Sequence, residues 1–354
     1  MTPALADYTT LGLGGRARSF VSAGTEAELI DAVKAADAAA EPVLLIGGGS
    51  NLAISDAGFP GTVIHVNTRG IGYAPQRIGA DGRAVDVTVA AGEDWDGVVA
   101  ATVAEGLAGL ESLSGIPGRA GATPIQNVGA YGREVAEVIT RVRVYDRRDD
   151  EILVLGNEDC SFAYRTSLFK STGARYVVLD VTFRLARQAL SLPVKYAELA
   201  AELGVTLGEG AGVGEVRSAV LKIRARKGMV LSPGDPDTRS AGSFFTNPII
   251  TAADLAAVEA AAAARAAGPV PRYEAGAGLV KVPAAWLIEH AGFAKGYGAP
   301  SPARVSSKHT LALVNTGNAT TADLLALARE IVAGVRSAYG VTLTPEPILV
   351  GVIL

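Results

Sequence analysis

The sequence has few residues that support disulfide, thiol or zinc chemistry. Its 354 residues include one cysteine, Cys160, which excludes an internal disulfide and a metal site built from several cysteines. The three histidines, His65, His290 and His309, lie far apart along the chain and do not have the spacing of a zinc motif. We therefore expect no metal centre.

Dense basic clusters and long apolar runs are also lacking. The net charge is −4, and the densest basic groups are residues 147–148 and 224–227, which argues against nucleic acid as the main partner. The longest alanine run, 260–264, is flanked by charged residues and predicts a helix of a soluble protein, with no insertion into a membrane. Residues 1–15 lack a basic start followed by an apolar core, so we expect no signal peptide.

The chain does contain enough apolar sequence for a globular protein of two or three domains. Hydrophobic residues make up 49% of it and charged residues 19%, a balance typical of folded proteins. Capping residues before apolar periodicity predict helices, and short apolar runs between turn residues predict strands. The expected helices are 29–38, 96–105, 215–226, 252–267 and one from about 320 to Gly340; the expected strands are 18–21, 43–46, 63–66, 84–91, 141–145, 151–155, 176–185 and 348–354, with a turn or linker at 204–214.

The most informative segment is residues 114–132, SGIPGRAGATPIQNVGAYG. Its glycines and prolines exclude a regular helix or a long strand. Apolar residues are spread through it and almost none of it is charged, which is typical of a loop that wraps a ligand. Backbone amides without a Cβ in the way can approach such a ligand closely. We expect the ligand to be large, partly anionic and partly flat.

Two shorter glycine segments compete for the role of a nucleotide loop. Residues 12–17, GLGGRA, match the dinucleotide fingerprint, but no apolar strand precedes them and a strand follows them, so we interpret the match as a turn. Residues 47–51, GGGSN, come directly after a buried strand, and no long helix follows. Alone they predict a plain glycine turn; together with residues 114–132 they predict a loop whose N–H groups hold a pyrophosphate.

Several motifs, taken in order, resemble the UDP-N-acetylenolpyruvoylglucosamine reductase family across nearly the whole chain. The segments similar to its flavin-binding motifs are LIGGGSNL (45–52), GIPG (115–118) and PIQNVGAYG (124–132). Further segments that fit are FAYRTS (162–167), GSFFTNP (242–248) and PE (345–346), while KYAEL (195–199) is similar to the tyrosine-bearing substrate loop of the longer family type. Each motif is modest alone, and the ordered set is specific.

The resemblance implies a cytoplasmic, monomeric α+β flavoenzyme of peptidoglycan synthesis. Two domains, 1–68 plus 344–354 and 69–213, would form an FAD-binding fold of the PCMH/VAO type, and 214–343 would bind the UDP-sugar substrate. NADPH would reduce a non-covalent FAD, whose N5 would pass hydride to the terminal carbon of an enolpyruvyl ether. The implied FAD-binding residues are Gly47, Gly48, Gly49, Ser50, Asn51, Leu52, Gly115, Ile116, Pro117, Gly118, Gly121, Ala122, Thr123, Gln126, Asn127, Gly129, Ala130, Tyr131 and Gly132.

Hydride addition leaves charge on the neighbouring carbon and its carboxylate, which calls for a cation and an acid. Ser243 lies in an apolar segment without an adjacent base; by itself it predicts a turn or cap serine, and the resemblance implies the proton donor. Arg165, in an apolar and strand-like context, needs an anionic partner, either a nearby carboxylate or the substrate. Glu346, between two prolines, is an exposed turn acid or, as the resemblance implies, a group at the reacting carbon.

The resemblance also implies contacts to the sugar nucleotide, for which a solvated surface position is the alternative. The candidates are Tyr196, Arg224, Lys227, Asn247 and Tyr273, together with Tyr164, for which the alternative is a core aromatic. Two departures from the family pattern affect this set. The segment 227–233 is longer than usual and is followed by Asp235 and Asp237, so the diphosphate ligands are not defined. Position 348, often an arginine, is Ile348, and we expect another basic residue in its place.

We expect Gly121, Ala122, Thr123 and Gln126 to line the isoalloxazine, with Ser243 across the substrate from them. Two other functions remain open. Another flavin oxidase or dehydrogenase of the same binding fold would explain the glycine segments, but not GSFFTNP with PE. A non-catalytic nucleotide-binding or regulatory module would explain less, and a colourless protein that takes up no FAD would favour it.

Overall fold

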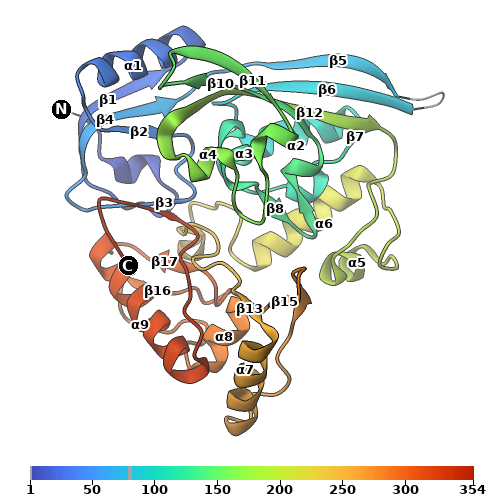
Figure 1. The fold of residues 1–354 in the computed structure, drawn as a ribbon. Helices are drawn as coiled ribbons and strands as arrows, with labels where there is room; N and C mark the ends of the chain where they lie inside the picture. Colours follow the sequence, from blue (N-terminus) through green and yellow to red (C-terminus); the bar gives the residue numbers. More distant parts are fainter. Residues whose placement is uncertain (1, 79–81) are drawn as a thin grey trace. The chain divides into compact units, whose positions relative to one another are not determined.

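The computed structural model describes residues 2–78 and 82–354 and shows a mixture of helices and strands (Figure 1). The chain divides into two compact units. Ala17–Gly49 and Pro60–Arg226 make up almost all of the first unit, and Pro3–Arg16, Ser50–Phe59 and Lys227–Leu354 make up the second. The predicted α+β class is confirmed, whereas the three predicted domain ranges remain a prediction.

A three-stranded sheet opens the first unit, in the order β1 (Ala17–Ala23), β4 (Phe59–Val66), β2 (Val43–Ile46). Helix α1 (Glu26–Ala38) packs against β1 and β2. It begins with the predicted capping box, in which the Thr25 hydroxyl accepts from the N–H of Glu28 and the Glu28 carboxylate accepts from the N–H of Thr25. Because a strand follows residues 12–17, their fingerprint match is not a Rossmann turn.

The largest element of the first unit is a six-stranded sheet, in which the strand pairs of the described residues are antiparallel. Its path is β11 (Glu151–Gly156), β10 (Ile139–Asp146), β12 (Tyr176–Arg187), β6 (Gly82–Ala90), β5 (Ile71–Ile78), and β7 (Leu107–Ala108) pairs with β12. One face is apolar, and Trp95 at the start of α2 (Trp95–Ala104) packs on Phe183 with ring centroids 5.6 Å apart. The other face carries polar pairs such as Thr88 with Thr182, because side chains alternate between the faces.

Short elements complete the first unit: α3 (Thr123–Gln126), β8 (Gly129–Ala130), β9 (Arg133–Glu134), α4 (Leu168–Ser171), α5 (Ala197–Leu203) and α6 (Val213–Arg226). Helices α5 and α6 share a small apolar core that includes Leu199, Val216 and Val220. Gly204 ends α5 with a φ of +69°, so the predicted turn after it is confirmed. The segment 114–132 contains only a 3-10 turn, one helical turn and a two-residue strand, as its glycines and prolines predict.

The second unit is built around a helical core. Its helices are α7 (Ala252–Ala264), α8 (Ala284–His290) and α9 (Thr321–Tyr339); its strands are β3 (Leu52–Ile54), β13 (Ile249–Thr251), β14 (Tyr273–Glu274), β15 (Leu279–Lys281), β16 (Ala303–Val305), β17 (Leu313–Asn315) and β18 (Ile348–Val350). Helix α9 starts at a capping box of Thr320 and Asp323 and ends at Gly340, whose φ is +70°. Its apolar stripe, as predicted, is buried in the core of this unit.

Several element boundaries differ from the sequence prediction, and at two of them a positive φ gives the reason. Helix α7 ends at Ala264, earlier than predicted, because Ala266 turns into the left-handed region with a φ of +54°. The last strand stops at Val350, before Gly351 at +68°. It pairs in parallel with β3, so the last strand lies beside a segment from the first part of the chain.

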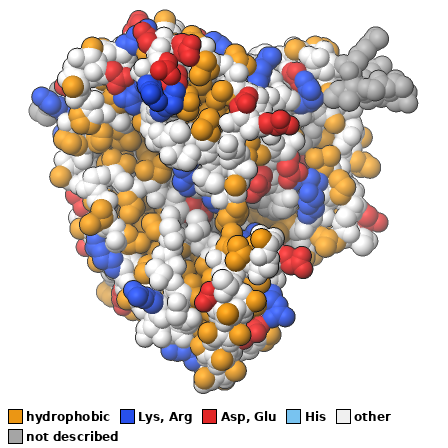
Figure 2. All heavy atoms as spheres, in the orientation of Figure 1, with side chains coloured by type: hydrophobic (Ala, Val, Ile, Leu, Met, Phe, Trp, Pro, Cys, Tyr) orange, Lys and Arg blue, Asp and Glu red, His pale blue; other side chains and the backbone are white. Residues whose placement is uncertain are grey.

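On the face shown in Figure 2, lysine and arginine side chains are scattered among acidic and apolar ones. In the part of the chain that the structure describes, no helix has both the length and the apolarity to span a membrane.

Candidate functional site

The two predicted glycine segments meet in the first unit. A Cβ added to Gly48 would lie 2.8 Å from the Cα of Gly118, so the two backbones touch where only glycine fits. Within residues 2–78 and 82–354, the N–H groups of Gly48 and Gly49 donate no hydrogen bond. Successive main-chain N–H groups without an acceptor in the protein can bind an anion, so the contact fits the diphosphate of a dinucleotide.

The middle of the long glycine-rich segment is held tightly to the sheet. The N–H of Gly121 donates to the carbonyl oxygen of Ala91 at 2.9 Å, and a Cβ on Gly121 would lie 2.5 Å from the Cβ of Ala91. The buried hydroxyl of Thr123 donates to a carbonyl of the preceding turn at 2.7 Å. The Gln126 side-chain oxygen accepts from Lys170 Nζ at 2.8 Å. These contacts fix the segment, and its predicted position along the isoalloxazine remains a prediction.

Arg165 lies at the tip of a tight turn, so the predicted strand-like context is wrong. Ala163 and Thr166 exchange two main-chain hydrogen bonds of 3.1 Å, and Arg165 between them has a φ of +55°. The left-handed conformation costs a non-glycine residue about 1–2 kcal/mol. Strain of this kind concentrates at ligand-binding positions. The aromatic residues of the motif 162–167 favoured a strand, and the motif contains no glycine, proline or asparagine that would predict a turn.

The Arg165 guanidinium is held along the glycine-rich segment. Its Nη2 donates to the carbonyl oxygen of Gly129 at 2.7 Å, its Nη1 donates to that of Asn127 at 3.4 Å, and its Cζ lies 5.3 Å from the ring centroid of Tyr164. Asn127 is itself buried, and its Nδ2 donates to Glu134 and to the carbonyl of Ala163. The arrangement therefore places the positive charge of Arg165 beside residues 124–132, which resemble a flavin-binding motif.

Three predicted site residues gather at the end of this segment, where α6 approaches it. The rings of Tyr131 and Tyr196 meet edge to face, with centroids 5.4 Å apart. Burial raises the pKa of Tyr131 to about 12, against the opposing effect of Arg224, which also hydrogen-bonds it. Arg224 is buried on α6. Gly132 allows the substrate-loop segment to approach, because a Cβ there would lie 2.9 Å from the Cβ of Lys195.

Replacing Tyr196 with phenylalanine should raise the KM for the sugar nucleotide about 2- to 10-fold, the value of one neutral hydrogen bond. The side chain is 40% exposed, so its hydroxyl can reach a ligand while its ring stays against Tyr131. Steady-state kinetics measure the effect, and kcat should change little. Tyr73→Phe, at another exposed tyrosine, is the control. An unchanged KM in Tyr196→Phe would make Tyr196 a packing residue.

The start of the glycine-rich segment is tied to α2 and α6 by Asp96, which sequence analysis missed. Its Oδ1 accepts from the N–H of Gly115 and from Arg217 Nη1, both at 2.6 Å, and its Oδ2 accepts from Arg217 Nη2 at 2.9 Å. Burial acts to raise the pKa of the Asp96 carboxyl, but these hydrogen bonds outweigh it and hold the pKa below its ordinary value. Asp96 and Arg217 are 121 positions apart, and no local pattern links them.

Asp96→Asn should lower the free energy of unfolding by about 1–3 kcal/mol at neutral pH, because charge-assisted hydrogen bonds become neutral ones. The folded pKa of Asp96 is depressed, so its stabilisation is complete above the unfolded value of about 3.9 and is lost as the pH falls through the folded pKa. Urea unfolding at pH 7 and near pH 3 tests this, with exposed Asp31→Asn as control. A difference from wild type that stays equal at both pH values contradicts the prediction.

Two predicted catalytic residues come together in the second unit. Residues 242–247 run antiparallel to 344–346; Phe245 forms a bridge with Pro345, and the N–H of Glu346 donates to the carbonyl oxygen of Phe244 at 2.9 Å. The two phenylalanines are buried and anchor the segment, with ring centroids 5.1 Å apart. Ser243, directly before this anchor, is only partly buried. The main chain therefore brings Ser243 to the neighbourhood of Glu346.

Asn51, from the first glycine segment, also contacts the Glu346 segment. Its Nδ2 donates to the carbonyl oxygen of Glu346 at 3.3 Å, and its own carbonyl accepts from the N–H of Ile348 at 2.9 Å. The parallel pairing of Leu52 with Ile348 extends this contact. Residues predicted to hold the cofactor and a residue predicted to act on the substrate are thus joined by hydrogen bonds.

The remaining substrate candidates are dispersed through the second unit. The Asn247 side-chain oxygen accepts from the N–H of Ala284 at the start of α8 (2.9 Å), so its carbonyl has a structural role. Tyr273 is 58% exposed on β14, where it pairs with Lys281 of β15. Lys227 begins the last stretch of the unit, Lys227–Leu354. These contacts do not test the predicted binding roles.

The acids that follow the lengthened segment 227–233 have partners within the protein. Asp235 forms an ion pair with Lys308. Asp237 is buried and accepts from the N–H of Ser307 at 2.9 Å and from its hydroxyl at 2.5 Å. Hydrogen bonds with Ser307, together with the charge of Lys308, outweigh burial and lower the pKa of Asp237. The departure from the family pattern therefore serves to fix the segment.

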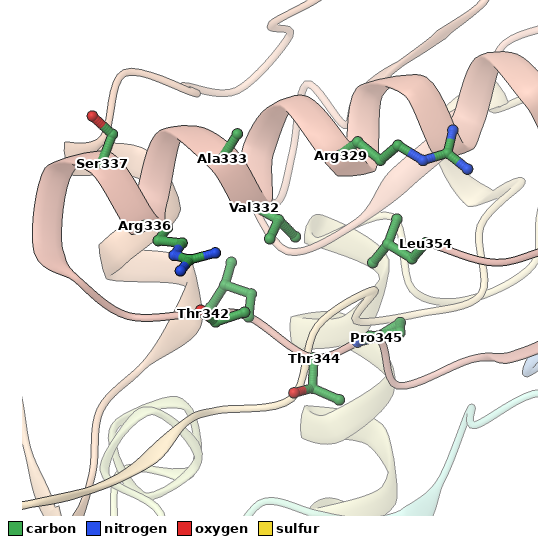
Figure 3. Close-up of a pocket in the computed structure, with 10 residues that line it drawn as sticks. Arg329, Val332, Ala333, Arg336, Ser337, Thr342, Thr344, Pro345 and Leu354 are labelled. Atoms are coloured by element: carbon green, nitrogen blue, oxygen red, sulfur yellow. The ribbon is translucent and has the colours of Figure 1, made fainter.

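A groove of about 600 Å³ lies along α9 in the same unit (Figure 3). It is lined by Arg329, Val332, Ala333, Arg336, Ser337, Thr342, Leu343, Thr344, Pro345 and Leu354. Glu346 and Ser243 do not line it, although Thr344 and Pro345, which pair with the Ser243 segment, do. In the described residues, no three His, Cys, Asp or Glu side chains gather in a group that could hold a metal ion.

The fold, the contact between the two glycine segments and the Arg165 guanidinium beside the second of them together define a class of protein. Residues 17–156 match the family of FAD binding domains, and the protein is an FAD-dependent oxidoreductase. Residues 235–350 match the C-terminal domain of UDP-N-acetylenolpyruvoylglucosamine reductase. The UDP-N-acetylenolpyruvoylglucosamine reductase of Thermobifida fusca is 55% identical over 99% of this chain and 97% of its own length, and that of Streptomyces coelicolor is 56% identical over 99% and 90%.

The chain belongs to the UDP-N-acetylenolpyruvoylglucosamine reductase family. Its fold is similar to the crystal structure of the Thermus caldophilus enzyme, with a TM-score of 0.64 and 26% identity over 98% of this chain and 97% of that one. The family predicted from the ordered motifs is confirmed, as are FAD as cofactor and NADPH as reductant.

Proposed function

We infer that this chain reduces UDP-N-acetyl-enolpyruvoylglucosamine to UDP-N-acetylmuramate in peptidoglycan synthesis, with NADPH as the electron source. The observation that carries the inference is the main-chain pairing of the Ser243 segment with Glu346, beside Asn51 of the first glycine segment. The pairing joins candidate groups for cofactor binding and for catalysis, and it occurs in a chain whose relatives, 55–56% identical, carry the name of this reductase.

FAD, when bound, accepts hydride from NADPH and delivers it to the terminal carbon of the enolpyruvyl group. The chain's part is to hold the cofactor and to exclude water. We propose that the N–H groups of Gly48 and Gly49 bind the diphosphate and that the segment 114–132 encloses the ring system. Asp96 supports this role, because it fixes the N–H of Gly115 at the start of the segment.

The substrate must receive a proton at the carbon next to its carboxylate, and charge must be stabilised until it does. We propose that the Ser243 hydroxyl supplies the proton, since it lies beside an apolar anchor that excludes water. The Glu346 carboxylate then takes part in the proton transfer, either by relaying the proton or by stabilising the group that carries it. Arg165 binds the substrate carboxylate, for which a guanidinium offers paired donors.

For the nucleotide, we propose that Tyr196 contacts the substrate and that Arg224 acts through Tyr131. Arg224 is buried, and burial lowers its pKa, while its hydrogen bond to Tyr131 gives it a structural partner. Lys227, Asn247, Tyr164 and Tyr273 are further candidates for substrate contacts. We also propose that the enzyme acts as a cytoplasmic monomer, which gel filtration at micromolar concentration and cell fractionation would test.

Anaerobic incubation with NADPH and the enolpyruvyl sugar nucleotide tests the function. One NADPH should be oxidised for each product molecule, and mass spectrometry should find a product heavier by two hydrogens. The same incubation without sugar nucleotide is the control. If the flavin is reduced by NADPH and no such product forms, the proposed substrate is wrong.

A further inference from the structure

Arg119 is the one charged residue in the segment 114–132. It lies where the two glycine segments touch. A Cβ added to Gly47 would lie 3.1 Å from both the Cβ and the Cγ of Arg119, and the neighbouring Gly118 is the residue that meets Gly48. The aliphatic stem of Arg119 therefore packs on the first glycine segment.

The Arg119 guanidinium lacks a partner in the part of the chain that the structure describes. Its Nε is shielded from solvent and has no hydrogen bond. The nearby carboxylates are engaged elsewhere: Glu93 accepts from the N–H of Gly70 at 2.7 Å, and Asp94 accepts from the N–H of Gly97 at 2.9 Å at the start of α2. The charges of both carboxylates still act on Arg119, but within the described residues neither of them hydrogen-bonds its guanidinium. A half-buried cation without a hydrogen-bonded counter-ion is costly, which indicates that this position is completed by an anion.

Other positive groups surround the same position. Arg69 donates to the carbonyl oxygen of Gly92 at 2.5 Å and is held near Arg119. Burial lowers the pKa of Arg119 and the charge of Arg69 lowers it further, while the charges of Asp94 and Glu93 act in the opposite direction. His65 responds in the same way, because burial and then Arg119 and Arg69 lower its pKa. The cluster concentrates positive potential beside main-chain N–H groups that donate no hydrogen bond.

We propose that Arg119 is a diphosphate-binding residue for FAD, adding a side-chain cation to the N–H groups of Gly48 and Gly49. The proposal rests on the FAD-dependent function argued above. It assigns to Arg119 no part in the transfer of hydride or protons. Arg119 sets how tightly the cofactor is held, and it makes that affinity depend on ionic strength.

Arg119→Met tests the proposal, because methionine keeps an unbranched stem and removes the charge. The measurement is FAD dissociation from the holoenzyme on dilution, followed by the rise of free-flavin fluorescence at several salt concentrations. We expect the Kd for FAD to rise about 10- to 100-fold, the value of a charge-assisted hydrogen bond. Its dependence on salt should become weaker, and Arg119→Lys should restore part of both.

Arg18→Met is the matched control, since Arg18 is 67% exposed and its ion pair with Glu41 is long, at 3.8 Å. If Arg119→Met does not fold, Arg119→Gln gives the same comparison. The proposal would be overturned if the Arg119 variant bound FAD as tightly as the wild type, or if the Arg18 control lost as much FAD affinity. It would also be overturned if the Arg119 variant lost affinity while the salt dependence of its Kd stayed unchanged. A wild-type protein that binds no FAD would instead refute the function on which the proposal rests.

Discussion

Ser243→Ala leaves the reduction of the flavin by NADPH close to the wild-type rate and slows its reoxidation by the enolpyruvyl substrate by about 10²–10⁴-fold. The magnitude is that of a positioned general acid. The two half-reactions separate because NADPH oxidation requires no proton at the substrate carbon. The variant should fold normally, since the main-chain bonds of Phe244 and the burial of both phenylalanines hold the segment without the serine hydroxyl. Stopped-flow absorbance under anaerobic conditions measures each half-reaction separately.

Ser337→Ala, at an exposed position on α9, is the matched control and should leave both half-reactions unchanged. Equal slowing of both half-reactions in Ser243→Ala would show that the residue holds the cofactor or the fold. An unchanged reoxidation rate would remove Ser243 from the chemistry, and the acid would have to be sought elsewhere.

Glu346→Gln should give the second large effect, again confined to the oxidative half-reaction. Glutamine preserves the shape of the side chain and cannot relay a proton, so a loss of about 10²–10⁴-fold in kcat is expected. The N–H and the carbonyl oxygen of Glu346 are held by Phe244 and Asn51, and neither bond involves the carboxylate. The fold should therefore tolerate the change.

Glu289→Gln, on the exposed side of α8, controls for the loss of a carboxylate from the same unit. Thermal unfolding of both variants checks that they remain folded. A turnover number equal to wild type in Glu346→Gln would place the carboxylate outside the site, and a fall in NADPH-driven flavin reduction would give it a role in cofactor binding instead.

The helices of ten or more residues could be predicted from the sequence because their end signals are local, whereas shorter ones such as α5 and α8 were not predicted. The capping boxes at Thr25, Thr251 and Thr320 and the terminating Gly340 each lie within a few residues of the helix end that they define. Such signals act through main-chain hydrogen bonds that form whatever the rest of the chain does. The β pattern was equally local, since alternating apolar residues have to face a core.

Some backbone conformations could not be predicted, because the residue types at those positions do not favour them. Ala266 ends α7 and Arg165 forms a turn, both with positive φ, although neither alanine nor arginine favours that region. At these positions the surrounding structure imposes the conformation. For Arg165, the compensating contacts come from Gly129 and Asn127, which lie far away in the sequence.

The order of the motifs was enough to identify the candidate site residues. It did not reveal the contacts that hold these residues in place. Ser243 and Glu346 were identified by resemblance, whereas the pairing that joins their segments spans nearly a hundred residues and has no signature in either. Asp96 was missed for the same reason, since its partner Arg217 lies on another helix. Arg119 did carry a signal, because it is a single cation in an otherwise uncharged loop. The structure explains this signal, since Arg119 packs against Gly47 and its neighbour Gly118 packs against Gly48.

The central claim is that this chain relays electrons from NADPH through its flavin to an enolpyruvyl sugar nucleotide. The most direct test is to reduce the purified protein with one equivalent of NADPH without oxygen and then to add UDP-N-acetyl-enolpyruvoylglucosamine while recording the flavin spectrum. The absorbance of oxidised flavin should disappear in the first step and return in the second, with formation of UDP-N-acetylmuramate. A flavin that is reduced by NADPH and stays reduced after addition of the sugar nucleotide would contradict the account.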